Sequence, residues 1–286
     1  MELIEQIRVA RHKRLYTTEE TTLIAQGGYR SPDAYLLEDV LVSIALKKPV
    51  LLKGPTGSGK TKMAETISAY FNQPMHSINC SVDLDAESML GFKTVVQQQG
   101  QTMIEFVEGP VVKAMKAGHI LYIDEINMAK AETLPILHGV LDHRRMLTNP
   151  FTGEVIYAHE DFNVIAAINE GYMGTTPMNE ALKNRFVSYS VPYISGEQLR
   201  ELWQERFPTL PFATKTMMLS LAEDLKNQVQ QGMLSEEAAS IRSLLDATEL
   251  AQYIEPLRAI RYAIAEKLAD QTERELVIEL AKTWIK

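Results

Sequence analysis

Short apolar runs alternate with helical patterns over the first two thirds of the chain. The runs are apolar at nearly every position instead of every second one, which is typical of strands buried on both faces. They predict strands at 49–53, 75–80, 119–124, 162–169 and 187–192. Strands that alternate with helices favour an α/β fold, with a parallel sheet covered by helices on both faces.

The segments between these runs carry apolar residues at helical spacing. The pattern predicts helices at 31–46, 60–71, 111–117, 131–146 and 179–186. Ser31 is the expected cap of the first of them, and Gly118 can end the third in a left-handed conformation. Two further segments, 89–110 and 144–162, have polar turns between extended stretches and predict β-hairpins. On residues alone, surface decoration is the alternative interpretation of both hairpins.

The strand pattern stops near residue 195. Every later segment has helical spacing, and Ser235 followed by two glutamates indicates the start of one such helix. We therefore expect three parts: an N-terminal helical arm at 1–30, an α/β nucleotide-binding domain at 31–195, and a small all-helical domain at 196–286.

Composition narrows the classes of protein. The chain has 286 residues, of which 45% are hydrophobic and 23% charged, as in ordinary folded domains. Its net charge is −8 and no Lys/Arg-rich block is present, which disfavours binding to a nucleic-acid backbone. Cys80 is the single cysteine, and the N-terminus lacks the apolar core of a signal peptide. These features predict a cytoplasmic protein without a membrane span.

The stretch "GPTGSGKT" between a predicted strand and a predicted helix fits a phosphate-binding loop in full. Backbone N–H groups of such a loop point at phosphate oxygens, and its glycines allow the close approach. The lysine can reach the β- and γ-phosphates, and the threonine hydroxyl can ligate Mg²⁺. The residues expected around the nucleotide are Gly54, Pro55, Thr56, Gly57, Ser58, Gly59, Lys60 and Thr61.

Two later strands end in polar residues suited to hydrolysis. Asp124 and Glu125 follow the strand at 119–124, and Asn169 ends the strand at 162–169. Parallel sheets bind ligands at the carboxyl ends of their strands. Asp124 is the expected Mg²⁺ ligand, Glu125 the expected base that polarises water, and Asn169 the amide that orients that water.

Two arginines are candidates for stabilising charge on the transferred phosphoryl group. Arg185 precedes the last predicted strand, and Arg242 lies near the start of a helix in the C-terminal part. Other candidates are weaker: His138 and His143 have no metal-binding companions at suitable spacing, so we interpret both as core or surface histidines. Cys80, Met217 and Met218 are expected to be core side chains.

The order of phosphate loop, Asp-Glu strand, Asn strand and two arginines resembles that of the AAA+ ATPases. Within them, "YIDEINMAKAETLPILHGVLDHRRM" and "INEGYMGTTPMNEALKNRF" are similar to the MoxR family, nearest its NorQ/CbbQ/GvpN-like branch. Met128 stands where many members have an arginine, and Ile241 where a proline commonly precedes the lid arginine.

The resemblance implies more than the residues do. It implies an ATP-driven, chaperone-like remodeller that forms a hexameric ring, with Arg185 acting on the ATP of a neighbouring subunit. Both hairpins would face the pore of that ring. It further implies a partner with a von Willebrand factor A domain, and a client protein complex that is activated or receives a metal.

Two other classes share the phosphate loop. A kinase would need an acceptor site and a lid with several arginines, and neither is visible. A nucleic-acid motor or a transcription activator is disfavoured by the acidic pI of about 5.4 and by the absence of "GAFTGA" from the first hairpin. ATP is favoured over GTP because no Asn-Lys-x-Asp guanine-binding motif is present.

Overall fold

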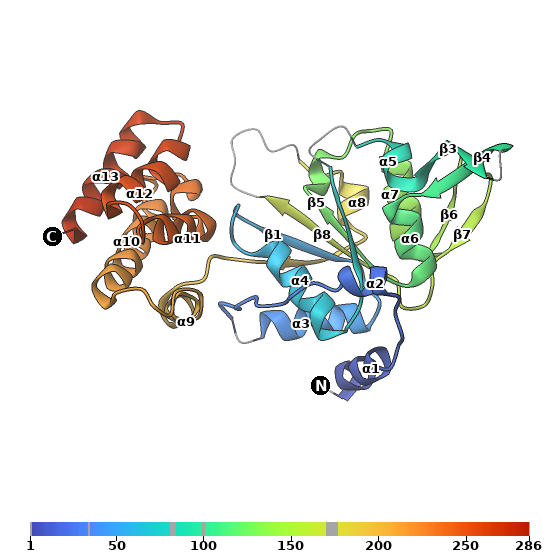
Figure 1. Ribbon diagram of the computed structural model, residues 1–286, viewed down its shortest axis with the longest axis horizontal. Helices are drawn as coiled ribbons and strands as arrows, with labels where there is room; N and C mark the ends of the chain where they lie inside the picture. The colour runs from blue at the N-terminus through green and yellow to red at the C-terminus, as the bar shows by residue number, and fades with distance from the viewer. Residues whose placement is uncertain (1, 34, 81–83, 99–100, 170–176, 286) are drawn as a thin grey trace. The chain divides into compact units, whose positions relative to one another are not determined.

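Five parallel strands form the central sheet of the computed structural model, which describes residues 2–33, 35–80, 84–98, 101–169 and 177–285 (Figure 1). Their spatial order is β2-β5-β8-β1-β9. The buried residues of the sheet are mainly aliphatic, as expected of a sheet covered on both faces. The strands are β1 (Val50–Gly54), β2 (Met75–Asn79), β5 (Ile120–Asp124), β8 (Asn163–Asn169) and β9 (Val187–Ser190). All five coincide with runs that the sequence predicts as strands, and β1 extends one residue further, to Gly54.

Helices pack on this sheet where the periodicity places them. Helix α4 packs on β5 and β8, α6 on β2 and β5, and α3 against β9. Gly118 ends α6 in a left-handed conformation, with φ 71° and ψ 35°, as predicted. The helices of this part are α3 (Leu36–Ala45), α4 (Lys60–Tyr70), α5 (Ala86–Leu90), α6 (Pro110–Ala117), η1 (Ile126–Met128), α7 (Leu134–Leu141) and α8 (Glu180–Lys183).

Two predicted helix boundaries are wrong by five residues. Ser31 does not cap the helix that follows: α3 begins only at Leu36, and its N-cap is Tyr35 without a side-chain hydrogen bond. The helix expected to reach residue 146 ends at Leu141. The residues beyond it are used in a turn and then in β6, whose pairing with β7 fixes them as strand.

The N-terminal arm contains two separate helices, α1 (Glu2–His12) and α2 (Thr18–Thr22). Arg11 of α1 is 4% exposed, and its Nη1 donates to Oε1 of Gln73 at 2.7 Å. Arg14 pairs with Asp161 at 3.2 Å, and the side chain of Thr17 caps α2. The arm is therefore held by buried and partly buried polar contacts to residues just before β2 and β8.

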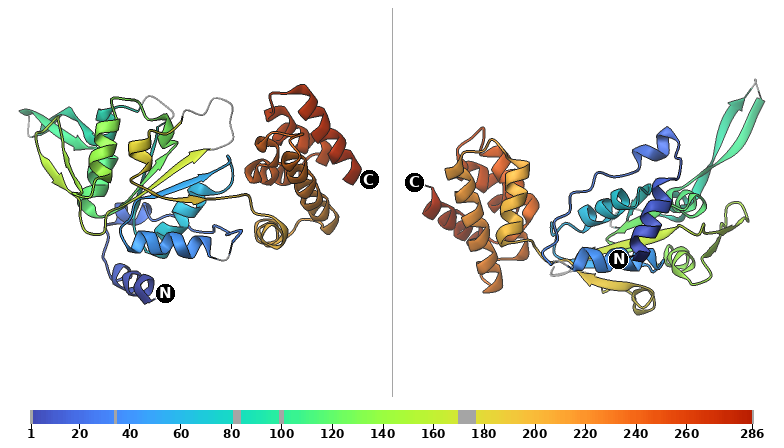
Figure 2. Two further views of the ribbon diagram at one scale, coloured as in Figure 1. Left: turned by 180° about the vertical axis from the view of Figure 1, so that it is seen from behind. Right: turned by 90° about the horizontal axis from the view of Figure 1, so that it is seen from below.

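Both predicted hairpins are present. The longer one, β3 (Gly91–Gln98) with β4 (Gln101–Glu108), is a two-stranded ribbon that projects from the body (Figure 2). Val95 and Ile104 face each other across it and are 66% and 72% exposed. The shorter hairpin is β6 (Met146–Thr148) with β7 (Val155–Tyr157).

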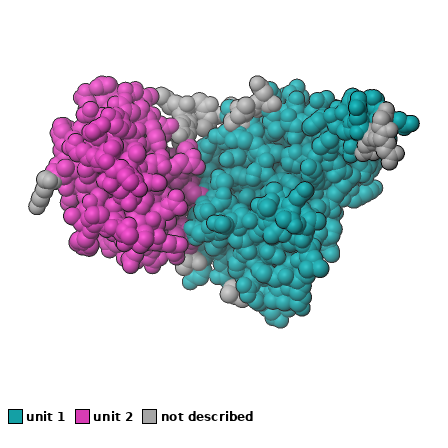
Figure 3. Space-filling model, viewed as in Figure 1, with its two compact units in different colours: residues 1–29, 35–53, 60–190 teal, residues 30–34, 54–59, 191–286 magenta. Residues whose placement is uncertain are grey.

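The chain divides into two units (Figure 3). Unit 1 comprises residues 1–29, 35–53 and 60–190 and contains the sheet. Unit 2 comprises residues 30–34, 54–59 and 191–286. Among the described residues, no helix has the length and apolar character needed to cross a bilayer.

Unit 2 has a helical core of its own. Trp203 is fully buried there, and its indole N–H donates to the hydroxyl of Thr248 at 3.0 Å. Met217 and Met218 are buried in the same cluster, as predicted. The helix expected at Ser235 is a short 3₁₀ turn. The elements are α9 (Gly196–Arg206), α10 (Phe212–Gln230), η2 (Glu236–Ala239), α11 (Ile241–Leu250), α12 (Pro256–Ala263), η3 (Ala265–Lys267) and α13 (Gln271–Trp284).

Candidate functional site

The predicted phosphate loop connects the end of β1 to the first residue of α4. Gly57 and Gly59 have φ values of 79° and 95°, which residues with a side chain rarely adopt. The side chains of Ser58 and Lys60 are buried. A strand, a left-handed glycine turn and a helix N-terminus thus follow one another as an anion-binding loop requires.

Asp124 and Asn169 lie at the same edge of the sheet. Their strands are neighbours in parallel register, with Ile123 opposite Ala166, so the carboxyl ends of both strands come together. Glu125 follows β5 with φ 52° and ψ 42°, a left-handed conformation that is uncommon without glycine. The Nδ2 of Asn169 donates to Oε1 of Glu125 at 3.0 Å. The sequence predicted this grouping, and the hydrogen bond supplies its geometry.

Tyr122 of β5 lies between Thr61 of α4 and the acidic residues at the end of β5. The sequence analysis did not identify it. It is 2% exposed, and its hydroxyl lies 3.0 Å from Oγ1 of Thr61. The same hydroxyl lowers the pKa of the Asp124 carboxyl. Residues 122 and 124 alternate with 123 along the strand, so they share one face of the sheet. That period of two was the signal that could have found Tyr122.

Burial dominates the electrostatics of the strand end. It raises the pKa of the Asp124 carboxyl, and the adjacent Glu125 carboxylate raises that pKa further. The backbone N–H of Glu125, the Lys60 ammonium and the Tyr122 hydroxyl oppose this shift. Burial beside the same carboxylates also raises the pKa of Tyr122. The edge therefore favours a bound cation.

The oxygen donors at this edge fit Mg²⁺. A threonine hydroxyl and a carboxylate are hard ligands, and Mg²⁺ usually takes one or two protein ligands together with substrate phosphates and water. In the part of the chain that the structure describes, no three His, Cys, Asp or Glu side chains gather in a metal-binding cluster. His138 is half-buried and His143 is 88% exposed, in line with their interpretation as core and surface residues.

Arg185 lies at the opposite edge of the sheet. It follows α8 and precedes β9, where Val187 pairs with Val50 at the amino end of β1. Its Nη1 donates to the carbonyl of Ala181. The length of β1 alone separates the two edges by about 13 Å. The structure therefore groups Lys60, Thr61, Asp124, Glu125 and Asn169, and does not bring Arg185 to them within one chain.

Arg242 is the second residue of α11 in unit 2, near the helix start, as predicted. Within that unit, a Cβ built on Gly57 would lie 2.3 Å from Oγ of Ser240 and 3.7 Å from the backbone nitrogen of Arg242. The hydroxyl of Tyr193 lies 2.7 Å from the carbonyl oxygen of Thr56. Tyr193 holds the loop and was not identified from sequence, because nothing near it in the chain marks that contact.

Part of the predicted motif after Asn169 falls at residues 170–176, outside the described residues. Cys80 is 3% exposed, and burial beside Asp124 and Glu125 raises the pKa of its thiol to about 12. It is therefore a protonated core side chain, as expected.

Two regions of the chain match models of known protein families. Residues 49–186 match the AAA domain of the dynein-related subfamily. Residues 206–283 match the C-terminal region of CbbQ, NirQ and NorQ.

Bacterial relatives match along nearly the full length. YojN of Bacillus subtilis, an uncharacterized protein, is 56% identical over 98% of this chain and 92% of its own. An uncharacterized protein of Staphylococcus haemolyticus is 57% identical over 87% of this chain and 95% of its own.

Solved structures share the fold at low identity. A candidate ATPase of Cytophaga hutchinsonii has a TM-score of 0.51 at 17% identity and covers 100% of this chain and 97% of its own. NtrX of Brucella abortus has a TM-score of 0.52 at 16% identity, covering 98% of this chain and 64% of its own.

Proposed function

The chain belongs to the MoxR family of AAA+ ATPases, and we propose that it hydrolyses ATP to remodel or activate a partner protein complex. The hydrogen bond between Asn169 and Glu125, beside Asp124, is the observation that carries the proposal. A carboxylate held next to a cation-binding carboxylate suits activation of water more than transfer to a substrate hydroxyl.

The residues at the carboxyl edge have separate tasks in this proposal. Lys60 and the loop N–H groups bind the phosphates, while Thr61 and Asp124 hold Mg²⁺. Bound there, Mg²⁺ would neutralise charge on the β- and γ-phosphates. Tyr122 orients Thr61 and Asp124 through its hydroxyl. Glu125 polarises the attacking water, and Asn169 fixes the Glu125 carboxylate by its hydrogen bond.

Arg185 acts on the nucleotide of a neighbouring copy. Its place at the amino edge supports this assignment, because the length of β1 separates that edge from the carboxyl edge in its own chain. We propose a ring of six copies, in which each Arg185 stabilises negative charge on the phosphoryl group bound by the next copy. Arg242 would contribute a second cation from the helical part.

The output of hydrolysis is mechanical. The two hairpins would face the ring pore and transmit motion to a client complex, assisted by a partner that carries a von Willebrand factor A domain. Metal insertion is one form that this activation would take. The family relationship supports this assignment, and we further propose a cytoplasmic location from the single, buried and protonated Cys80.

Glu125→Gln tests the assignment of the base. The amide keeps the size of the side chain but cannot accept a proton, so turnover should fall by about 10²- to 10⁴-fold while ATP binding persists. Calorimetry with ATP and Mg²⁺ measures binding, and phosphate release measures turnover. Normal turnover in this variant would show that Glu125 is not the base. A requirement for DNA or for a phosphoryl acceptor would favour a motor or a kinase.

A further inference from the structure

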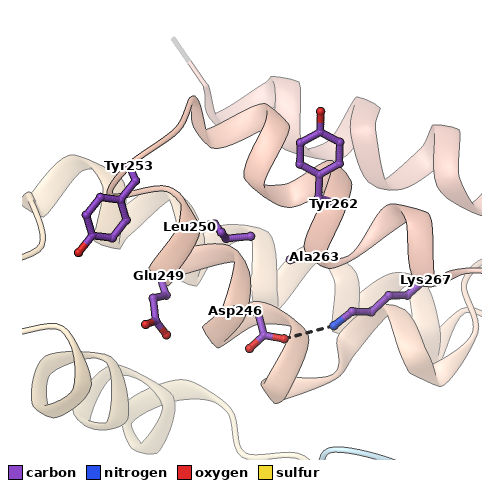
Figure 4. Close-up of a pocket in the computed structure, with 7 residues that line it drawn as sticks. All are labelled: Asp246, Glu249, Leu250, Tyr253, Tyr262, Ala263 and Lys267. Carbon is purple, nitrogen blue, oxygen red and sulfur yellow. Dashed lines mark hydrogen bonds and ion pairs between the residues drawn. The ribbon is translucent and has the colours of Figure 1, made fainter.

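The tyrosines of unit 2 lie in two different settings. Tyr253 and Tyr262 line an open groove between α11 and α12, where they are 84% and 52% exposed (Figure 4). Tyr193 instead is half-buried and packs against the helical core of the unit. Its hydroxyl faces backbone carbonyls, which gives this tyrosine a polar environment that the two groove tyrosines do not share with it.

The Tyr193 hydroxyl joins two segments that are distant in the chain. Its oxygen lies 2.7 Å from the carbonyl oxygen of Thr56 in the phosphate loop and 3.0 Å from that of Glu236 in η2. A hydroxyl carries one hydrogen, so it donates fully to one of these carbonyls at a time. The shorter distance indicates Thr56 as the main acceptor.

The hydrogen bond to Thr56 fixes the direction of the next N–H group. None of the described peptide bonds is cis, so the bond between Thr56 and Gly57 is trans. In a trans peptide the carbonyl and the N–H lie in one plane and point in opposite directions. A hydroxyl that holds the Thr56 carbonyl on one side therefore directs the Gly57 N–H to the other. Among the described residues, no backbone carbonyl accepts from that N–H.

A second contact from the helical part restrains the same peptide. A Cβ built on Gly57 would lie 2.3 Å from Oγ of Ser240, so the serine packs directly against the α-carbon of the glycine. Ser240 is 6% exposed and immediately precedes α11. Tyr193 at the carbonyl and Ser240 at the α-carbon together limit rotation of this peptide plane.

The start of the phosphate loop has few N–H groups to offer. Such a loop binds its anion through several convergent N–H groups. Pro55 has none, and the N–H of Ser58 donates to the Pro55 carbonyl at 3.3 Å. A correctly directed Gly57 N–H should therefore contribute measurably to phosphate binding.

We propose that Tyr193 is a positioning residue for nucleotide binding, whose hydroxyl directs the Gly57 N–H toward the phosphates through the Thr56 carbonyl. The inference deepens the proposed function and rests on its nucleotide-binding loop. The phosphates meet a donor that is already oriented, so binding does not have to turn the peptide. The peptide keeps this orientation before and during the reaction, so Tyr193 should change affinity and leave the rate of the chemical step unaltered.

Tyr193→Phe in the full chain tests the inference, because it removes the hydroxyl and keeps the ring. Calorimetry with ADP and Mg²⁺ should show roughly three- to tenfold weaker binding, as expected for one neutral hydrogen bond. Phosphate release should show a KM for ATP raised by a similar factor, with kcat unchanged. The inhibition constant of adenosine, from displacement of a fluorescent ADP analogue, should equal that of the wild type because adenosine carries no phosphate.

Tyr189→Phe is the matched control. Tyr189 is also half-buried, and its hydroxyl donates to a backbone carbonyl, that of Asp39 in α3, at 3.0 Å. Tyr262→Phe, in the groove of Figure 4, is a second control within unit 2. Both variants should bind ADP as the wild type does. Circular dichroism checks that every variant is folded.

Several results would overturn the role of Tyr193. These are an unchanged ADP affinity in Tyr193→Phe, an equal weakening of ADP and adenosine, a lower kcat with KM unchanged, a loss of the same size in Tyr189→Phe, or a wild type that does not bind ADP. Binding of ADP requires no turnover. A chain that binds ADP with the expected dependence on Tyr193 but does not hydrolyse ATP would therefore refute the proposed function alone.

Discussion

The carboxyl edge and the amino edge of the central sheet carry different groups of polar side chains. At the carboxyl edge, Lys60, Asp124, Glu125 and Asn169 lie together, with a hydrogen bond of 3.0 Å already made between the last two. At the amino edge, beside β1 and β9, cations surround a pocket with one carboxylate. One edge is prepared for a cation and phosphates, and the other presents unbalanced positive charge. The proposed action of Arg185 on a neighbouring copy requires this difference, because it pairs the amino edge of one chain with the carboxyl edge of the next.

The amino edge is itself divided. Near β5 and β8 it is filled by the N-terminal arm, where Arg11 and Arg14 bond with Gln73 and Asp161. Near β1 and β9 it is open. Because the arm satisfies the charges of one half, we expect substitutions there to change stability, and substitutions in the open half to change activity between copies.

Arg185→Ala should have the largest effect. Loss of an arginine that stabilises the transferred phosphoryl group should lower turnover by about 10³-fold, with ATP binding by calorimetry unchanged. Arg8→Ala, an exposed arginine of α1, is the control and should leave turnover unaltered.

Mixing the Arg185→Ala and Glu125→Gln variants tests whether Arg185 acts on a neighbouring copy. Arg185→Ala retains Glu125, and Glu125→Gln retains Arg185, so mixed assemblies contain some complete sites. Phosphate release should then exceed that of either variant alone. If the mixture is as inactive as its components, the two edges do not meet between copies.

Asn169→Ala should have the next largest effect. Without the amide, Glu125 loses the hydrogen bond that fixes its carboxylate, and misplacement of a catalytic group costs about 10²-fold in turnover. Nucleotide affinity should change little because Asn169 is not assigned to the phosphates. Asn227→Ala, at an exposed position of α10, is the control. Equal losses in both variants would contradict a role at the carboxyl edge.

Low pH should destabilise the fold at the part of the amino edge that the N-terminal arm covers. Burial, together with the neighbouring His76, lowers the pKa of His119 to about 4, below the ordinary value of 6.5, so the folded state binds fewer protons than the unfolded one. Stability from this residue is complete above pH 6.5 and decreases towards pH 4. At pH 5 the loss in the free energy of unfolding is about 2 kcal/mol.

Urea unfolding at pH 7.5 and pH 5 measures this change, with His119→Phe as the comparison. Glu20 and Arg14 also face His119 and act in opposite directions, so the variant isolates the imidazole. A variant with the same pH dependence as the wild type would assign the loss to other groups.

Tyr122→Phe should have the smallest effect of the four. Its hydroxyl lowers the pKa of Asp124, so its removal should raise that pKa and move the acid limb of Mg²⁺-ATP binding to higher pH. We expect roughly a tenfold loss of affinity near that limb and little at neutral pH. Tyr157→Phe, at an exposed tyrosine, should leave the profile unchanged.

Local patterns predicted most of the fold and much of the candidate site. Buried strands appear as continuous apolar runs, and the polar residues after them meet because parallel strands end at one edge. Asp124, Glu125 and Asn169 could therefore be grouped before any coordinates. The same reasoning placed Gly118 at a helix end, since a left-handed residue after a periodic segment favours glycine.

What sequence missed depends on contacts distant in the chain. Tyr193 approaches Thr56 across 137 positions, and no local pattern encodes that contact. The helix after Pro135 was predicted too long because its last residues pair with β7, which overrides their helical spacing. Ser31 failed as a cap since its hydroxyl donates to the carbonyl of Asp33 instead. The cations around the pocket at the amino edge were equally invisible, because they come from several segments of the chain.

The ribbon of β3 and β4 has a practical consequence. Two strands alone are marginally stable in water, and both outer strand edges could accept a further strand. Val95 and Ile104 are largely exposed, so a chain that is overexpressed without its proposed partners risks aggregation through this ribbon. We therefore expect a monodisperse sample from purification at low protein concentration, or from purification together with a protein that binds the ribbon.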